Sequence, residues 1–501
     1  MSEIDERLLV PLAALSGILY FLAFPGMDLW PLAFVAQAPL ILALRGQAPG
    51  RAAMLGLVSG FTSSAAICAW LFGTIQRFGG FSAGPSMAIM VLLCLWTGGR
   101  TALLGWLHGR ATPRGWPAAP VFVLAFVASE ITYPFLFPWY FGVTVHNAIA
   151  LLQVAELGGP FLVGAMLLAP NLAVAELVAA RLERRGPSRR LLLAGLAIPA
   201  LAAGYGAIRI HQVDARAAAA PPIRIGLAQA NQPLVGRHEA VKTNTRLTHA
   251  LRDAGAELVI WSESTLPDTF PESTYRDQIR RDITADLGVA TIIGTSVKRE
   301  EGAREFNTAL LADTNGAILG RYDKRFLLPF GEYIPFGDTF PSLYAYSQNS
   351  GRVSPGESTE PLVLRGHPIT ALICYEDILP GFVNAIVAHA QPELLVNLTI
   401  DTWFGRTSEP WQHVGLAAMR AVEHRRYLAR ATNSGVSAII DPSGRVIVHG
   451  GVFEEEAIVG EARWMRSTTV YEILGDAPLY ACAVAIAVMA LVERRRFARP
   501  A

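Results

Sequence analysis

The sequence predicts two folds in one chain: a polytopic α-helical membrane domain of about eight helices, and an α/β domain with two packed sheets and helices outside. Three observations predict this. Apolar segments fill most of residues 1–210 and return at 476–493, and a helix needs about 20 apolar residues to cross a bilayer. Residues 222–468 instead alternate strand-like and helical runs. The 501 residues are 52% hydrophobic and only 17% charged, and this length predicts at least two domains.

Seven apolar segments precede the soluble part and one follows it. The expected spans are 8–25, 28–45, 52–75, 85–107, 117–137, 158–180, 190–209 and 476–493. The first is too long for a signal peptide and lacks a cleavage site. The expected parts are therefore a seven-helix domain at 1–210, an Ala- and Pro-rich linker at 211–221, a soluble domain at 222–468, a helix at 476–493 and a tail at 494–501.

Arginines gather in alternate loops of the membrane part, and basic loops face the cytoplasm. They are Arg45, Arg51, Arg110, Arg114, Arg181, Arg184, Arg185, Arg189, Arg190 and Arg494 to Arg496, with Arg77 as the main exception. This pattern predicts that both termini are cytoplasmic. The soluble domain then lies on the periplasmic face of a bacterial inner membrane.

Ionisable residues also lie in or near the apolar spans. Arg100 and Glu176 are expected near the cytoplasmic ends, where their side chains could reach the interface. Glu130 precedes an aromatic run at 133–141 and is expected toward the outer face, as part of an interfacial belt or beside an entry point for a lipid headgroup.

The soluble part reads as alternating strands and helices. Strands are expected at 223–228, 258–261, 290–295, 309–312, 318–322, 369–373, 394–398, 428–432, 437–440 and 446–449, and helices at 239–254, 275–287, 381–389 and 409–427. No glycine pattern for a nucleotide occurs, and the four cysteines lack metal-ligand spacing. The net charge of +1 does not indicate nucleic-acid binding. No cofactor or metal is therefore expected.

Three residues in the soluble part could form a catalytic site. Cys374 ends an apolar run at 369–373, Glu263 follows the run at 257–261, and Lys324 follows the run at 318–322. A thiol with a pKa of about 8.5 needs a base to become a nucleophile. Glu263 could serve as that base, and Lys324 with the N–H of Tyr375 could stabilise an oxyanion. Taken alone, Cys374 is better explained as a buried core residue, and the acid and lysine motifs reverse that preference.

The motifs Trp-Ser-Glu at 261–263, Tyr-Asp-Lys at 322–324 and Ile-Cys-Tyr-Glu at 373–376 resemble the Glu-Lys-Cys triad of the nitrilase superfamily, whose fold is an αββα sandwich. With the segments 327–335, 401–405 and 411–413 set between membrane spans, nearly the whole chain resembles the membrane-anchored apolipoprotein N-acyltransferase family. One departure is Ser262, since the family usually has proline before the catalytic glutamate.

The resemblance implies catalytic roles for Glu263, Lys324 and Cys374 and supporting or substrate-binding roles for Glu332, Tyr375, Glu376, Trp403 and Phe404. It implies a two-step acyl transfer through a cysteine thioester. The donor is a phospholipid, expected to be phosphatidylethanolamine, and the acceptor is the α-amino group of an S-diacylglyceryl cysteine at a lipoprotein N-terminus. The membrane tether favours a monomer.

Two other functions are compatible with parts of the sequence. A membrane-tethered amidase could use the same triad on a small soluble substrate, but it would not need seven preceding helices. A transporter or scaffold could carry an inactive outer domain, but transporters usually show internal repeats, and none is evident in this sequence.

Overall fold

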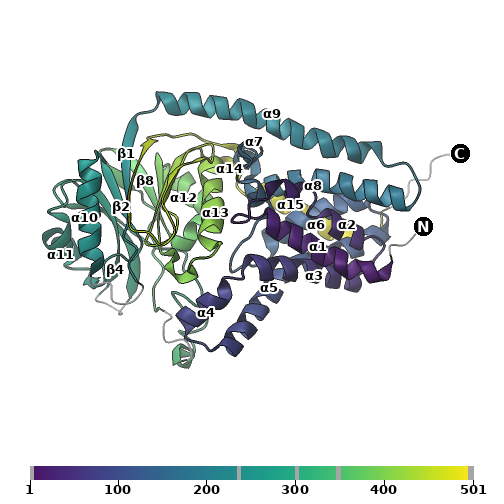
Figure 1. The fold of residues 1–501 in the computed structure, drawn as a ribbon, viewed down its shortest axis with the longest axis horizontal. Helices are drawn as coiled ribbons and strands as arrows, with labels where there is room; N and C mark the ends of the chain where they lie inside the picture. The colour runs from purple at the N-terminus through teal and green to yellow at the C-terminus, as the bar shows by residue number, and fades with distance from the viewer. Residues whose placement is uncertain (1–4, 234–238, 300–303, 346–350, 495–501) are drawn as a thin grey trace. The chain divides into compact units, whose positions relative to one another are not determined.

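The computed structural model describes residues 5–233, 239–299, 304–345 and 351–494. The chain forms two compact units. A helical unit comprises the chain up to residue 72, residues 84–209 and the chain from residue 474, and an α/β unit comprises 73–83 and 210–473 (Figure 1). Arg495 and Arg496 of the expected tail lie outside the described residues.

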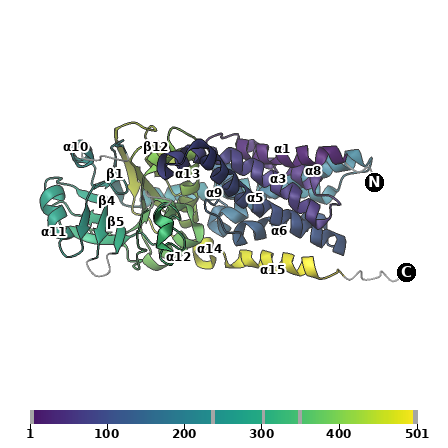
Figure 2. The same ribbon diagram turned by 90° about the horizontal axis from the view of Figure 1, so that it is seen from below.

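The apolar helices have two lengths, and all lie in the helical unit except most of α4 and the end of α9, which belong to the α/β unit. Among the described residues, four are long enough to cross a membrane: α1 (Glu6–Ala23), α5 (Ala83–Ala111, continued to Arg114), α8 (Ala155–Leu182) and α9 (Arg189–Ala219). A bent pair, α3 (Pro49–Ile67) and α4 (Leu71–Gly79), counts as a fifth span if its 61° bend is ignored. Shorter apolar helices are η1 (Trp30–Phe34) with α2 (Ala38–Ala43), α6 (Ala118–Thr132) and α15 (Ala477–Leu491), and α15 packs along α6 (Figure 2).

Each of the eight expected apolar segments is largely helical, but not all are single long helices. The segment expected at 28–45 breaks into two pieces because Pro31 and Pro39 each start a new helix, where the missing N–H costs nothing. The remaining short helices are η2 (Thr112–Arg114), η3 (Phe141–Val145) and α7 (Ile149–Leu152). The helix α8 is irregular at Gly158 and Gly159, where φ reaches 61° at Gly159.

Two further differences concern charge and the linker. Arg100 and Glu130 form a buried ion pair at 3.4 Å within the helical unit, so the expectation that Arg100 reaches the interface is wrong. A carboxylate partner offsets the cost of burying the guanidinium among apolar helices.

Residues 211–219, which were expected to be a linker, instead continue α9, because an Ala-rich run favours helix.

The α/β unit contains two sheets that pack face to face. Among the described residues, the first sheet has the order β13-β1-β2-β4-β5-β6, with β3 on β4, and the second has β12-β11-β10-β9-β8-β7. The first sheet comprises β1 (Pro222–Gln229), β2 (Leu258–Trp261), β3 (Thr269–Pro271), β4 (Ala290–Lys298), β5 (Glu305–Ala312), β6 (Ile318–Asp323) and β13 (Glu456–Arg463). The second comprises β7 (Leu362–Leu364), β8 (His367–Ile373), β9 (Leu394–Thr399), β10 (Tyr427–Thr432), β11 (Ala438–Ile440) and β12 (Val446–His449).

Helices cover the outer faces of both sheets (Figure 1). The first sheet carries α10 (Ala240–Asp253) and α11 (Tyr275–Ile279), which continues as a π-helical turn at Arg280–Thr284. The second carries α12 (Pro380–Ala390) and α13 (Glu409–His424), and α14 (Val470–Leu474) follows the sheets. An apolar core that includes Ile225, Ile260, Ile369 and Val396 fills the space between the sheets. This arrangement confirms the expected two-sheet sandwich with helices outside.

Candidate active site

The candidate nucleophile lies in a tight turn at the end of a buried strand. Cys374 directly follows β8, begins the short helix η8 (Cys374–Ile378) and has a φ of 52°. Few residues other than glycine adopt such a φ, and strained conformations of this kind cluster at functional sites. The amide of Asn397 on β9 donates a hydrogen bond to the Cys374 carbonyl at 3.1 Å and so holds the turn.

Lys324 and two glutamates form a buried ionic cluster. Lys324 follows β6 and is 1% exposed, and its Nζ lies 2.8 Å from Glu332 Oε2 and 3.4 Å from Glu263 Oε1. Glu263 follows β2, and Glu332 also accepts a hydrogen bond from the Leu328 N–H. The structure therefore brings the predicted acid and lysine together, with the predicted supporting residue Glu332 as the nearer partner of the lysine.

The charges of this cluster act on Cys374. Burial raises the pKa of the Cys374 thiol well above its usual value, Glu263 raises it further, and Lys324 opposes both. Burial also raises the pKa of Glu263, against the effect of Lys324. Burial disfavours a charged Lys324, but Glu332 and Glu263 outweigh it and raise the lysine pKa well above its usual value. At neutral pH the lysine is therefore charged and the resting thiol is protonated, so attack requires a proton acceptor.

Asn307 on β5 is a site residue that was not expected from the sequence. Its side-chain nitrogen donates to Glu263 Oε1 at 2.7 Å and to Glu332 Oε1 at 3.0 Å, and its backbone carbonyl accepts from the backbone N–H of Lys324 at 2.8 Å. One side chain thus fixes both carboxylates that face the Lys324 ammonium. A sequence signal exists, because asparagine is depleted in strands and here interrupts a buried apolar run.

Replacing Asn307 by leucine should lower the rate of acyl transfer at least tenfold. Both glutamates lose a charge-assisted hydrogen bond of the stronger kind, so the base is held less precisely. The rate is measured with purified full-length chain. The matched control is Asn244→Leu, which removes another buried amide, on α10, whose nitrogen donates to the Ala240 carbonyl. Equal rates for the two variants would contradict the role of Asn307.

The two residues after the nucleophile have different surroundings. Glu376 is fully buried, and its carboxylate accepts hydrogen bonds from the Tyr322 hydroxyl and from the backbone N–H groups of Arg325, Phe326 and Ile373, at 2.8 to 3.0 Å. It therefore ties the chain after Lys324 to the strand that ends at Cys374. Tyr375 is also buried, and its ring lies 6.1 Å from that of Phe326.

The loop that carries Trp403 contacts the segment 73–83, which belongs to the same compact unit. Trp403 and Phe404 lie in η9 (Asp401–Phe404). The Trp403 ring meets Phe78 edge-on at 4.7 Å, and its carbonyl accepts hydrogen bonds from Thr74 at 3.2 Å and Arg77 at 3.1 Å. Arg77, the exception to the pattern of basic loops, is therefore engaged in holding this loop.

A buried network of charges connects the Cys374 turn to the Trp403 loop. His413 on α13 contacts Asp377 Oδ1 at 2.8 Å through Nε2 and Asp401 Oδ1 at 3.2 Å through Nδ1. Arg430 on β10 donates to Asp377 at 2.9 Å, to Asp401 at 2.8 Å and to Asn397 at 2.8 Å. Glu409, Asp401 and His413 are close enough to hold a metal ion, but His413 and Asp401 already bind each other, and Arg430 and Asp377 complete their contacts. The cluster fits an ion-pair network.

This network makes a pH-dependent contribution to stability. Burial and Arg430 oppose protonation of His413, but Asp377 and Asp401 outweigh them and raise its pKa to about 9. An unfolded histidine has a pKa of about 6.5. The contribution is therefore complete below pH 6.5 and is lost as the pH rises through 9, and it amounts to roughly 3 kcal/mol.

We expect the unfolding free energy of the full chain to fall between pH 6.5 and 9.5, and the fall should be smaller in His413→Gln. The measurement is thermal unfolding of both proteins across this range. The partly exposed residue His249, replaced by glutamine, provides the control, which should follow the wild-type curve. Identical pH slopes for wild type and His413→Gln would contradict a charged His413.

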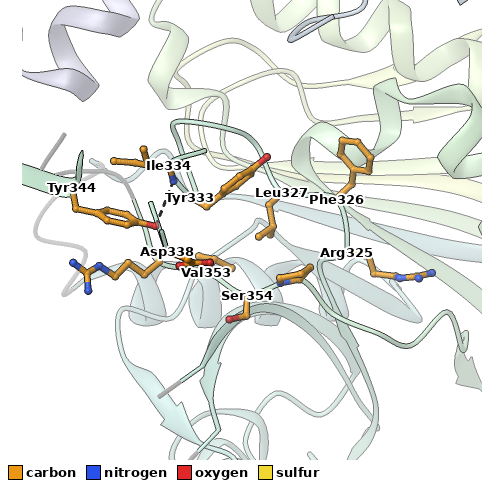
Figure 3. A pocket seen from close by; sticks show the side chains of 11 residues that line it. Arg325, Phe326, Leu327, Tyr333, Ile334, Asp338, Tyr344, Val353 and Ser354 are labelled. Carbon is orange, nitrogen blue, oxygen red and sulfur yellow. Dashed lines mark hydrogen bonds between the residues drawn. The ribbon is translucent and has the colours of Figure 1, made fainter. Parts of the chain in front are cut away.

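A pocket of about 360 Å³ adjoins the residues that follow Lys324 (Figure 3). Its wall is mixed: Phe326, Leu327 and Ile334 are apolar, while Arg325 and Asp338 are charged. Tyr344, in η7 (Pro341–Ala345), closes one side by contact of its hydroxyl with the Ile334 N–H at 3.5 Å. The remaining lining residues are Tyr333, Arg352, Val353, Ser354 and Pro355.

Comparisons with known proteins identify both units. A family model described as carbon-nitrogen hydrolase matches residues 224–467, and one described as Apolipoprotein N-acyltransferase N-terminal domain matches residues 16–173. The apolipoprotein N-acyltransferase of Geobacter metallireducens is 31% identical over 97% of this chain and 95% of its own, and that of Azotobacter vinelandii is 32% identical over the same shares. An amidase structure from Nesterenkonia sp. AN1 is 22% identical and covers 52% of this chain and 98% of its own, with a TM-score of 0.38. The sequence matches show that the chain belongs to the apolipoprotein N-acyltransferase family.

Proposed function

We propose that the chain transfers a fatty acyl group from a phospholipid to the α-amino group of the N-terminal S-diacylglyceryl cysteine of lipoproteins, through a thioester on Cys374. The observation that carries this proposal is the Glu263–Lys324–Glu332 cluster acting on the thiol of Cys374, in a chain of this family. Phosphatidylethanolamine is the proposed donor.

In the first half-reaction, Glu263 accepts the thiol proton as the sulfur attacks the ester carbonyl of the phospholipid. The oxyanion of the tetrahedral intermediate is stabilised by Lys324 and the Tyr375 N–H. The C–O bond then breaks, and Glu263 returns the proton to the leaving alcohol of the lysophospholipid. The acyl group remains on Cys374 as a thioester.

In the second half-reaction, the neutral amine of the lipoprotein attacks the thioester carbonyl. Glu263 accepts a proton from the amine, the C–S bond breaks, and the proton returns to the thiolate of Cys374. A thioester reacts readily with amines, provided that water is kept out. The pocket beside Lys324 has apolar and charged walls, which suit an acyl chain and a polar headgroup.

The proposed setting is a bacterial inner membrane. The arginine-rich loops between the eight expected membrane segments support a topology with both termini in the cytoplasm and residues 222–468 in the periplasm. Membrane segments before and after this domain in the sequence keep it near two lipid substrates. The effective concentration of both substrates at the site is thereby raised. The membrane tether favours a monomer.

The test is acyl transfer by the purified full-length chain, with phosphatidylethanolamine and a synthetic diacylglyceryl lipopeptide. Mass spectrometry should show lipopeptide heavier by one acyl group and an equal amount of lysophospholipid. A tethered amidase, the alternative function, would leave the lipopeptide unchanged and release ammonia from small amides. That outcome would overturn the proposal.

A further inference from the structure

A second, larger cavity lies entirely within the helical unit. It has a volume of about 690 Å³ and is lined by the end of α5, the start of α6, the last turns of α8, the start of α9, and α2 with the segment after it. None of the triad residues lines it. Arg45, Arg185 and Arg190 line it. In the topology proposed above, these arginines lie at the cytoplasmic end of the helical unit.

Two of the arginines at this cavity are fixed in place. Arg185 binds Glu176 with both terminal nitrogens, at 2.5 and 3.0 Å, and Glu183 through Nε at 2.5 Å. Arg45 donates to Glu183 at 2.6 Å through one nitrogen. These contacts build a rigid rim. Glu176 is the only carboxylate among the described lining residues, against three arginines, so the cavity favours an anion.

Arg190 contributes a charge that the protein leaves uncompensated. It is exposed, lines the cavity and forms no ion pair with any described residue. The start of α6 faces the same space with Ala118 and Ala119, and none of the side chains that the structure describes caps this 15-residue helix. Free N–H groups at a helix N-terminus attract anions.

His108 supplies an independent indication of a ligand. It lines the cavity, its side chain is buried with the residue only 3% exposed, and its Nδ1 has no hydrogen-bond partner among the described residues. A buried polar atom without a partner is costly. A ligand oxygen in the cavity would satisfy it.

We propose that this cavity binds the headgroup of an anionic phospholipid, as distinct from the phospholipid consumed at Cys374. The phosphate would lie between Arg190, the free N–H groups of Arg45 and His108. The apolar residues Ile41, Leu172 and Leu191, which line the same cavity, would contact the start of the acyl chains. Basic pockets between membrane helices commonly bind anionic headgroups, and the apolar wall favours a lipid over a soluble phosphate.

The experiment is lipid titration of the purified full-length chain in neutral detergent, followed by native mass spectrometry and thermal unfolding. Phosphatidylglycerol should bind at least tenfold more tightly than phosphatidylcholine and should raise Tm, and this preference should weaken as salt is added. Arg190→Gln should weaken phosphatidylglycerol binding about fivefold, since one basic residue contributes about that much. Arg190→Glu should weaken it further.

Arg189→Gln is the matched control, because Arg189 is also exposed at the start of α9 but does not line the cavity. It should bind phosphatidylglycerol like the wild type. Equal affinity for the two lipids, equal effects of the two glutamine variants, or full competition by glycerol 3-phosphate would each overturn the proposal. The readouts do not involve acyl transfer, so they are independent of the catalytic proposal.

Discussion

Cys374→Ser should lose acyl transfer by a factor on the order of 10⁴ or more while remaining folded. A serine hydroxyl has nearly the same shape but is far less acidic than a thiol, and Glu263 is a weak base. The turn itself is held by the Asn397 contact to the Cys374 carbonyl, which the substitution leaves in place.

The measurement is the initial rate of lipopeptide acylation, with thermal unfolding as the test of folding. Cys482→Ser is the control, because Cys482 is a partly exposed cysteine on α15, and its rate should equal that of the wild type. A Cys374→Ser rate above about a hundredth of the wild-type rate, in a folded protein, would refute the role of Cys374 as nucleophile.

Lys324→Met should reduce acyl transfer by roughly 10²- to 10³-fold, which is the usual loss when one oxyanion-stabilising group is removed. Methionine keeps the length of the side chain but removes its charge. Glu263 and Glu332 then face each other without a cation, and the pKa of Glu263 rises further because Lys324 no longer opposes the effect of burial. Removal of one partner from a buried pair also destabilises the fold, by about 3 to 5 kcal/mol.

Rate and stability can be separated with two further variants. Lys242→Met removes an exposed lysine that pairs with Glu239 and should change neither quantity. The double variant Lys324→Met with Glu332→Gln removes one of the two unpaired carboxylates, so it should recover stability but not rate. Recovery of rate in the double variant would show that Lys324 acts only as a structural counter-ion.

The sequence predicted those structural features that one residue or one short apolar run determines. Apolar runs predicted the helices and the central strands because burial requires them. The edge strand β13 was missed, since Glu456, Glu461 and Arg463 break its apolar pattern and its pairing with β1 is long-range. Strands β3 and β7 have only three residues each and lack a periodic signal.

The candidate site also contains residues that a local motif indicates and residues that only the fold brings together. Glu263, Lys324 and Cys374 could be named because each follows an apolar run and matches a motif. Asn307, His413 and Arg430 were not predicted as parts of the site, because their contacts join segments far apart in sequence and depend on the packing of both sheets. Sequence reasoning placed Glu376 only as a neighbour of Cys374, whereas the structure gives it four hydrogen-bond donors in one buried position.

The central claim is that Cys374 carries the acyl group. Its most direct test is the intact mass of the purified chain after incubation with phosphatidylethanolamine alone, beside Cys374→Ala treated identically. The account predicts a mass gain of one fatty acyl group in the wild type that hydroxylamine removes, and none in the variant. An unchanged wild-type mass in a folded, lipid-exposed protein, or an equal gain in Cys374→Ala, would contradict it.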